Sequence, residues 1–339
     1  PSSDHVCTRS EHVSYVDSIS NTIANYLGLN TELTKAIAVS HDIGHSPFGH
    51  KGEKVLNEIS LRDIGQSFWH EKNGVHFVDD IELLEDANGD LKNLDLTYAV
   101  RDGIISHCGE IDENSLKPRS QAIDLKDYTK PNEYSPYTWE ACVVKISDKI
   151  SYIGRDIEDA FHLNLLNNEK LEELKNILGI QNKEALNNPN IINELIIDIC
   201  NNSTIEKGIC FSTEKLNLIN KIKEFNYNNI YSHPRLDASN EYFKIIINRI
   251  YNTLKNAYDK ENTLSNLEEL KKFYPQTIIR FKDWLHKYWN LTDRTNTNLK
   301  NKIIYDYTNP QDYYKAIIDF IAGMTDNYAI DMYNEIVSF

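Results

Sequence analysis

The residues best suited to chemistry lie close together between positions 41 and 53. This stretch holds three histidines, an aspartate and a glutamate, namely His41, Asp42, His45, His50 and Glu53. Imidazole nitrogens and carboxylate oxygens are ligands that suit borderline and hard divalent metals. Adjacent His41 and Asp42 can both reach one cation if they lie where a helix loosens at its end. The stretch therefore predicts part of a metal site.

Two ligands do not make a metal site, so further ligands must come from elsewhere in the chain. His12 and Asp148 are the best placed by pattern, because each lies in a stretch with the apolar spacing of a helix. A single histidine or aspartate on a helix is more often a surface or hydrogen-bonded residue than a ligand. The density of candidates at 41–53 outweighs that general expectation.

Helices must position these residues, because apolar side chains recur every three or four positions along much of the chain. This spacing predicts an all-α fold, and polar and turn residues predict loops at 86–95 and 110–137. The longest expected helix carries Asp148. The expected helices span residues 13–27, 31–42, 137–166, 169–178, 191–200, 241–258 and 312–337.

The charge of the chain limits its partners. There are 51 acidic and 36 basic residues, which give a formal net charge of −15. Such a surface repels polyphosphate backbones, so nucleic acid is possible as a partner but not indicated. A phosphorylated substrate would need a local basic patch or a bound cation.

The cysteines and the hydropathy pattern indicate a cytoplasmic protein. Five cysteines are scattered without any Cys-x-x-Cys spacing, which predicts neither a disulfide framework nor a thiolate zinc site. An apolar run of about 18 residues, which a membrane span would need, is not found. The chain begins with Pro1, so we expect that part of the N-terminal region is missing.

Several motifs carry a resemblance to a known family. His12, the His41-Asp42 pair and the distant Asp148 follow the order of the signature of HD-superfamily phosphohydrolases. The block at 41–53 is the most specific, since an isolated His-Asp pair is common by chance. Together the motifs resemble the deoxyguanosine triphosphate triphosphohydrolase-like family over nearly the whole chain: Arg9-x-x-His12, residues 41–53, 101–104, Asp148-Lys149-x-x-Tyr152, 156–160, 233–235 and 322–329.

The resemblance implies a fold and a domain organisation. We expect an HD-domain helical bundle with additional C-terminal helices. Residues 1–166 would form the metal-dependent phosphohydrolase core, and residues 167–339 a helical C-terminal region packed on that core.

The resemblance also implies one divalent metal ion per site, held by His12, His41, Asp42 and Asp148. Waters or phosphate oxygens would complete the coordination shell. Two histidines and two aspartates accept several metals, with occupancy governed by availability. We expect Mn²⁺ or Mg²⁺ first, with Fe²⁺, Co²⁺, Ni²⁺ or Zn²⁺ as alternatives.

A catalytic pair of His50 and Glu53 is implied as well, in which the carboxylate orients the imidazole for proton transfer. Their spacing agrees, because residues three apart share a helix face if a helix begins at Gly49. A carboxylate favoured at a helix start by the helix dipole is the alternative explanation for Glu53. His45 and His70 resemble further active-site histidines of the family, although either can be structural.

Four residues are implied to bind the substrate. Arg9 and Lys149 would contact phosphate, although Lys149 can also be a surface lysine turned away from Asp148. Tyr152 and Asp156 follow Asp148 by one and two helical turns, so the three share a stripe of one helix. Tyr152 would pack on the sugar and exclude a 2′-hydroxyl, or belong to the core. Asp156 would accept a hydrogen bond from the 3′-hydroxyl.

The activity implied is hydrolysis of deoxynucleoside triphosphates to deoxynucleoside and inorganic triphosphate. An HD-type nucleotide phosphatase or phosphodiesterase would use the same metal ligands, but Lys149, Tyr152 and Asp156 favour the triphosphohydrolase. A non-catalytic nucleotide-sensing protein is the alternative outside enzymes, and the full set of ligand and catalytic positions opposes it. The resemblance further implies a homo-oligomer, either a tetramer or a hexamer.

Overall fold

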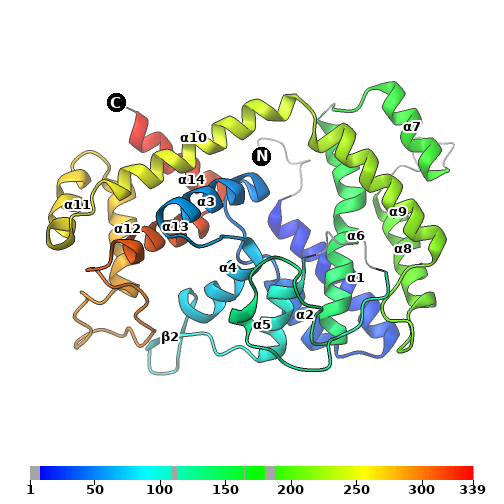
Figure 1. Cartoon of the computed structure of the whole chain (residues 1–339), viewed down its shortest axis with the longest axis horizontal. Helices are drawn as coiled ribbons and strands as arrows, with labels where there is room; N and C mark the ends of the chain where they lie inside the picture. Colours follow the sequence, from blue (N-terminus) through cyan, green and yellow to red (C-terminus); the bar gives the residue numbers. More distant parts are fainter. Residues whose placement is uncertain (1–7, 109–113, 164, 180–187, 339) are drawn as a thin grey trace. The chain divides into compact units, whose positions relative to one another are not determined.

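The computed structural model describes residues 8–108, 114–163, 165–179 and 188–338, so Cys7 lies outside the described residues. Within these ranges helices are the main regular structure, and the one sheet is a two-stranded antiparallel hairpin (Figure 1). This confirms the all-α prediction.

Helices make up the chain from α1 near its start to α14 near its end. In chain order they are α1 (Arg9–Leu27), α2 (Thr31–Ser40), α3 (Gly49–Asp63), α4 (His70–His76), α5 (Tyr98–Ser106), α6 (Trp139–His162), α7 (Asn168–Leu178), α8 (Asn188–Asn202), α9 (Thr213–Asn226), α10 (Arg235–Lys255), α11 (Thr263–Lys271), α12 (Pro275–Tyr288), α13 (Pro310–Ala322) and α14 (Asp326–Val337). The strands are β1 (Leu83–Glu85) and β2 (Leu91–Asn93), and π-turns span Phe77–Ile81 and Tyr227–Tyr231.

Several boundaries differ from the sequence-based expectation, and three of the differences change the number or the end of an expected element. The predicted loop at 86–95 contains β2, which pairs with β1 around a tight turn. The helix expected at 312–337 is two helices, because α13 ends at Ala322 and Thr325 caps the start of α14 with its side chain. The helix expected to run to residue 42 ends at Ser40, so His41 occupies the C-cap.

The chain forms two compact units, each assembled from two separate stretches. Unit 1 comprises residues 1–42 and 97–237, and unit 2 comprises residues 43–96 and 238–339. This is a different division from the one expected at residue 166, because sequence patterns do not reveal that a compact unit is interrupted by another. The expected division into a phosphohydrolase core at 1–166 and a C-terminal region at 167–339 stays a prediction.

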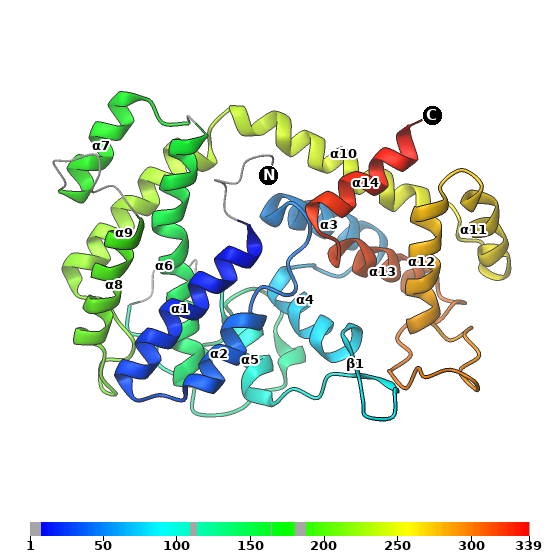
Figure 2. The ribbon, with the colours of Figure 1, turned by 180° about the vertical axis from the view of Figure 1, so that it is seen from behind.

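Unit 1 is organised around α6, which packs against α1, α2, α5, α8 and α9 (Figure 2). The start of α1 is fixed by a capping box between Thr8 and Glu11, and Gly28 ends the helix in the left-handed conformation. Val16 of α1, Ile37 of α2 and further apolar residues of α6 are fully buried together. The apolar spacing that predicted these helices is therefore the spacing of their buried faces.

Unit 2 packs α3, α10, α12, α13 and α14 around a second apolar core, which contains Leu56 and Phe281. A partly buried ionic network joins α4 to α13 inside this unit. The two ring nitrogens of His76 lie 3.0 Å from an oxygen of Asp80 and 2.9 Å from an oxygen of Asp319. These contacts hold the C-terminal end of α4 in place, and His70 lies at the N-terminal end of the same helix.

Among the described residues, none of the helices has the length and apolar content that crossing a lipid bilayer would require.

Helix α8 offers a matched test of the core of unit 1. Ile199 is fully buried there, whereas Ile197 on the same helix is 51% exposed. We expect Ile199→Ala to lower the free energy of unfolding by about 2–5 kcal/mol, because the lost side chain leaves a cavity. Ile197→Ala should change it by less than about 0.5 kcal/mol. Urea unfolding followed by circular dichroism measures both, and equal losses would contradict the assigned faces of α8.

Candidate functional site

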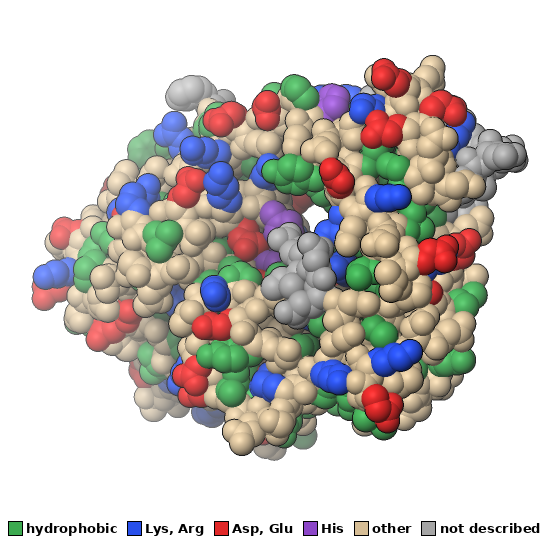
Figure 3. Space-filling view, turned by 45° about the vertical axis from the view of Figure 1, so that its right-hand side comes forward, with side chains coloured by type: hydrophobic (Ala, Val, Ile, Leu, Met, Phe, Trp, Pro, Cys, Tyr) green, Lys and Arg blue, Asp and Glu red, His purple; other side chains and the backbone are tan. Residues whose placement is uncertain are grey.

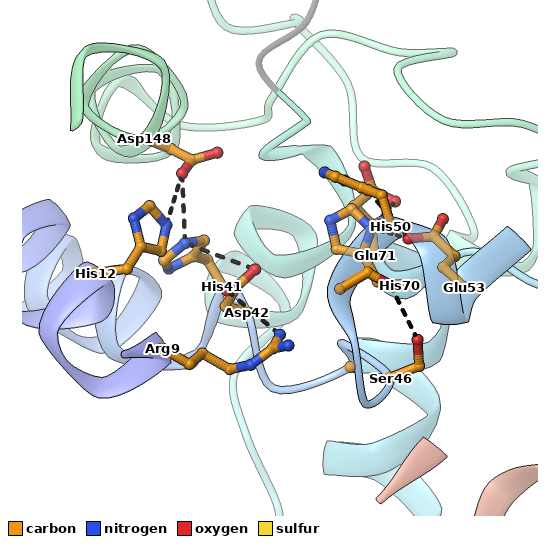
Figure 4. A network of polar contacts seen from close by, with 12 residues as sticks. Arg9, His12, His41, Asp42, Ser46, His50, Glu53, His70, Glu71 and Asp148 are labelled. Carbon is orange, nitrogen blue, oxygen red and sulfur yellow. Dashed lines mark hydrogen bonds and ion pairs between the residues drawn. The ribbon is translucent and has the colours of Figure 1, made fainter. Parts of the chain in front are cut away.

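Three helices of unit 1 bring His12, His41 and Asp148 together (Figure 4). His12 lies on the buried face of α1, His41 is the C-cap of α2, and Asp148 lies in the middle of α6. All three side chains are almost completely buried. Figure 4 shows both imidazoles pointing at the Asp148 carboxylate.

The separations of these groups suit a shared cation. His12 Nε2 lies 3.0 Å from Asp148 Oδ1, and His41 Nε2 lies 3.7 Å from the same oxygen. His41 Nε2 is 3.9 Å from Asp42 Oδ1. A metal with bonds of about 2.1 Å holds neighbouring ligands about 3.0 Å apart and opposite ones about 4.2 Å apart. Each predicted ligand therefore lies within reach of an ion that it would share with at least one other, and His41 is the member that lies close to each of the other three.

The orientation of the two imidazoles also fits a metal. His41 Nδ1 lies 2.6 Å from the Ala38 carbonyl, which can only accept, so this nitrogen carries the proton and Nε2 is the basic one. His12 Nδ1 lies 3.2 Å from the Ser151 hydroxyl, which directs its Nε2 towards Asp148. Within the described chain, Nε2 of each histidine and Oδ1 of Asp148 are buried without a hydrogen bond. Buried polar atoms in that state are costly, and a cation would offset the cost.

The electrostatics of the group agree with this interpretation. Burial would raise the pKa of the Asp148 carboxyl, but the neighbouring His12 and His41 hold it well below its usual range. Burial would lower the pKa of His41, yet Asp148 and Asp42 raise it to about 9. The site thus favours positive charge, and a metal ion would take the place of the proton on His41.

The predicted substrate residues of unit 1 lie along the same helices. Arg9, in the first turn of α1, reaches Asp42 with a nitrogen–oxygen distance of 3.7 Å. The Tyr152 ring lies 4.3 Å from the His12 ring, measured between centroids. Lys149 is half-buried next to Asp148 on α6. Asp156, two turns further along, accepts a hydrogen bond from the hydroxyl of Tyr231.

His107 is a neighbour of this group that sequence analysis did not identify. It is the C-cap of α5, it is 1% exposed, and its ring centroid lies 5.0 Å from that of His41. It follows the motif at 101–104 in the sequence, but nothing in its local sequence distinguishes it from a structural histidine. Its position became evident only through the packing of α5 against α2 and α6.

Unit 2 gathers the other predicted residues. His45 precedes α3, His50 and Glu53 lie in its first turns, and His70 begins α4. The rings of His45 and His70 are stacked, with centroids 4.0 Å apart and planes within 13°. The His50 ring meets the His45 ring edge-on at 5.1 Å. Three of the four residues are mostly buried, while the His50 side chain is 62% exposed.

Glu53 is shared between two histidines, which extends the pair expected from the sequence. One oxygen of Glu53 lies 2.9 Å from His70 Nδ1 and 3.4 Å from His50 Nδ1 (Figure 4). Burial would raise the pKa of Glu53, but both imidazoles lower it, so the carboxylate stays ionised. Glu71, which sequence analysis did not assign, adds a second buried carboxylate 3.4 Å from His70 Nδ1. Such an arrangement orients the imidazoles and places negative charge beside them.

A close backbone contact fixes His45 against α4. A side chain at Gly44 would place its Cβ 2.1 Å from both the His70 carbonyl and the Gly74 nitrogen, so only glycine fits. The buried Asn73 amide donates to the Gly44 carbonyl over 2.7 Å. This contact determines how the loop that carries His45 lies on the helix that carries His70.

Family comparisons bear on both groups. The sequence profile of the HD domain matches residues 9–153, and that of the phosphohydrolase-associated domain matches residues 285–335. The first match contains every predicted metal ligand.

Relatives extend the similarity over the whole chain. A protein of Caldanaerobacter subterraneus named deoxyguanosinetriphosphate triphosphohydrolase-like protein is 30% identical over 337 residues, covering 99% of this chain and 76% of the relative. Proteins of the same name from Clostridium tetani and Rickettsia typhi are each 28% identical, covering 98% of this chain and 76% and 83% of their own lengths. The chain therefore belongs to the deoxyguanosinetriphosphate triphosphohydrolase-like family of HD-domain phosphohydrolases.

Proposed function

We propose that this protein hydrolyses deoxynucleoside triphosphates to deoxynucleoside and inorganic triphosphate, with one divalent metal held by His12, His41, Asp42 and Asp148. The main support is that Nε2 of His12, Nε2 of His41 and Oδ1 of Asp148 are buried close together and have no hydrogen bond within the described chain. The family and the names of its members support the substrate class. A nucleotide-binding tetramer or hexamer, implied by the same resemblance, is part of the proposal.

The substrate must be received by a chain of net charge −15. Acidic and basic side chains are interspersed over the face shown in Figure 3, so local cations have to supply the attraction. Arg9 is 40% exposed in its side chain beside Asp42, and its planar guanidinium suits phosphate oxygens. We assign Arg9 and Lys149 to the phosphates.

When bound, a divalent cation would supply Lewis-acid polarisation of the α-phosphate and a water activated at neutral pH. We assign proton transfer at the 5′-oxygen to His50, because this imidazole is exposed and lies 3.4 Å from the Glu53 carboxylate. Glu53 stabilises the protonated ring, and it fixes His70 at 2.9 Å. His45, stacked on His70, would help to hold this second imidazole in place.

The preference for deoxyribose is assigned to α6. Tyr152 is 37% exposed and lies against His12, where its ring can pack on a sugar and leave no room for a 2′-hydroxyl. Asp156 already accepts a hydroxyl hydrogen bond from Tyr231, so its carboxylate is oriented for such a donor. We assign it to the 3′-hydroxyl.

The first test is product analysis. The protein is incubated with each of the four deoxynucleoside triphosphates and Mn²⁺, with a chelator control, and the products are separated by ion exchange. We expect a deoxynucleoside and intact triphosphate, and no turnover with the chelator. Stepwise release of phosphate would favour an HD-type phosphatase instead. A thermal shift with nucleotide but no product would favour a nucleotide-sensing protein.

Two variants should separate metal binding from proton transfer. Asp148→Asn should lose both bound metal and turnover, because it removes a carboxylate between two histidines. His50→Ala should keep the metal but lose turnover by about 10²–10⁴-fold, the usual contribution of acid–base catalysis. Metal content by mass spectrometry and initial rates measure the two effects. Asp331→Asn, at an exposed position on α14, is the control. Full activity in either variant would refute its assignment.

Tyr152→Ala should relax sugar selectivity. With the ring removed, a 2′-hydroxyl can enter, so the ratio of kcat/KM for deoxyribonucleotide over ribonucleotide should fall by about tenfold or more. The same assay with both substrate classes measures it. Tyr26→Ala, at a tyrosine of α1 that is 63% exposed, should leave the ratio unchanged. An unchanged ratio in Tyr152→Ala would mean that this tyrosine only packs against His12.

A further inference from the structure

His107 is arranged in the same way as the predicted ligand His41. Each follows the last residue of a helix, with His41 at the C-cap of α2 and His107 at the C-cap of α5. In each, Nδ1 lies 2.6 Å from the carbonyl three residues earlier, Ala38 for His41 and Ile104 for His107. Because a carbonyl only accepts, Nδ1 of both rings carries the proton and Nε2 is the basic nitrogen.

The ring of His107 also lies at the predicted metal site. A ring nitrogen of His107 and the ligand atoms of His41 and Asp148 all lie within 4.8 Å of one another. The rings of His41 and His107 meet edge-on at 81°, and both are almost completely buried. Opposite donors on one ion lie about 4.2 Å apart, so a group of ligand atoms of this size could close on one cation with small movements of the side chains.

We propose that His107 is a fifth protein ligand of the metal, which makes the donor set three imidazoles and two carboxylates. The inference rests on the proposed metal-dependent function, but not on the identity of the substrate. Nε2 is the donor, and the Nδ1 bond to Ile104 fixes the ring as the bond to Ala38 fixes His41.

A fifth protein ligand changes what the site can do. With five protein donors, fewer positions on the ion would remain for water or a phosphate oxygen than with four. A third imidazole also moves the preference away from Mg²⁺, which favours oxygen donors, and towards Mn²⁺, Fe²⁺, Co²⁺ or Ni²⁺. We therefore expect Mg²⁺ to bind more weakly than Mn²⁺.

Counting the nitrogens bound to Mn²⁺ tests the proposal directly. Pulsed electron paramagnetic resonance on the Mn²⁺-loaded protein should show three coordinated imidazole nitrogens. His107→Gln should show two, and its dissociation constant for Mn²⁺ should rise by about 10–100-fold. His286→Gln, at an exposed histidine of α12, should keep three nitrogens and the original affinity.

The possible outcomes are distinct. Two nitrogens in the wild-type protein would overturn the role of His107, and this measurement needs no variant, so it holds even if His107→Gln does not fold. No binding of Mn²⁺ by the wild-type protein would overturn this inference and the proposed metal site together. Three nitrogens without hydrolysis of deoxynucleoside triphosphates would support the ligand and count only against the proposed substrate.

Discussion

The burial of the Asp148 carboxylate between two imidazoles is the constraint on which unit 1 depends. A carboxylate in a protein interior is tolerated only beside compensating positive charge, and removing that partner typically costs about 3–5 kcal/mol. His41, 3.7 Å away, provides this charge when protonated, and a cation held with His12, 3.0 Å away, would provide it as well. The meeting of α1, α2 and α6 is therefore as much an electrostatic requirement as an apolar one. The end of α2 at Ser40 belongs to the same requirement, because it directs His41 to the carboxylate.

Unit 2 meets a different requirement, which is to fix the imidazoles of His45 and His70 by packing while that of His50 stays exposed. The Gly44 backbone packs directly on α4, the Asn73 amide binds its carbonyl, and His45 is consequently stacked on His70. The same oxygen of Glu53 then contacts the buried ring of His70 and the exposed ring of His50. A fixed imidazole keeps the carboxylate ionised and oriented, and the exposed His50 is the ring that solvent or a ligand can reach.

The sequence predicted the parts of the site whose signal is local. The block at 41–53 contributes residues to both groups. His12 and Asp148 were chosen from their places on predicted helices together with the family signature, and their side chains lie 3.0 Å apart. His107, Glu71 and Asn73 were missed, because each depends on which helices pack together and not on its own neighbours in sequence. Likewise, apolar spacing continues across the break between α13 and α14, which is marked by Gly323 at the C-cap of α13 and Thr325 at the N-cap of α14.

The hydrogen bond between Tyr231 and Asp156 bears on how selectivity for a sugar would arise. In the protein alone, the Asp156 carboxylate already has a hydroxyl donor, supplied by the π-turn Tyr227–Tyr231. A sugar hydroxyl bound there would exchange one hydroxyl–carboxylate bond for another, so the net gain in affinity would be small. A sugar without that hydroxyl would either leave the Tyr231 hydrogen bond in place or displace Tyr231 and bury the Asp156 carboxylate without a donor. The second case costs free energy, because a buried carboxylate then lacks a hydrogen bond. On the proposed function, this contact would therefore contribute to discrimination between sugars more than to the strength of binding.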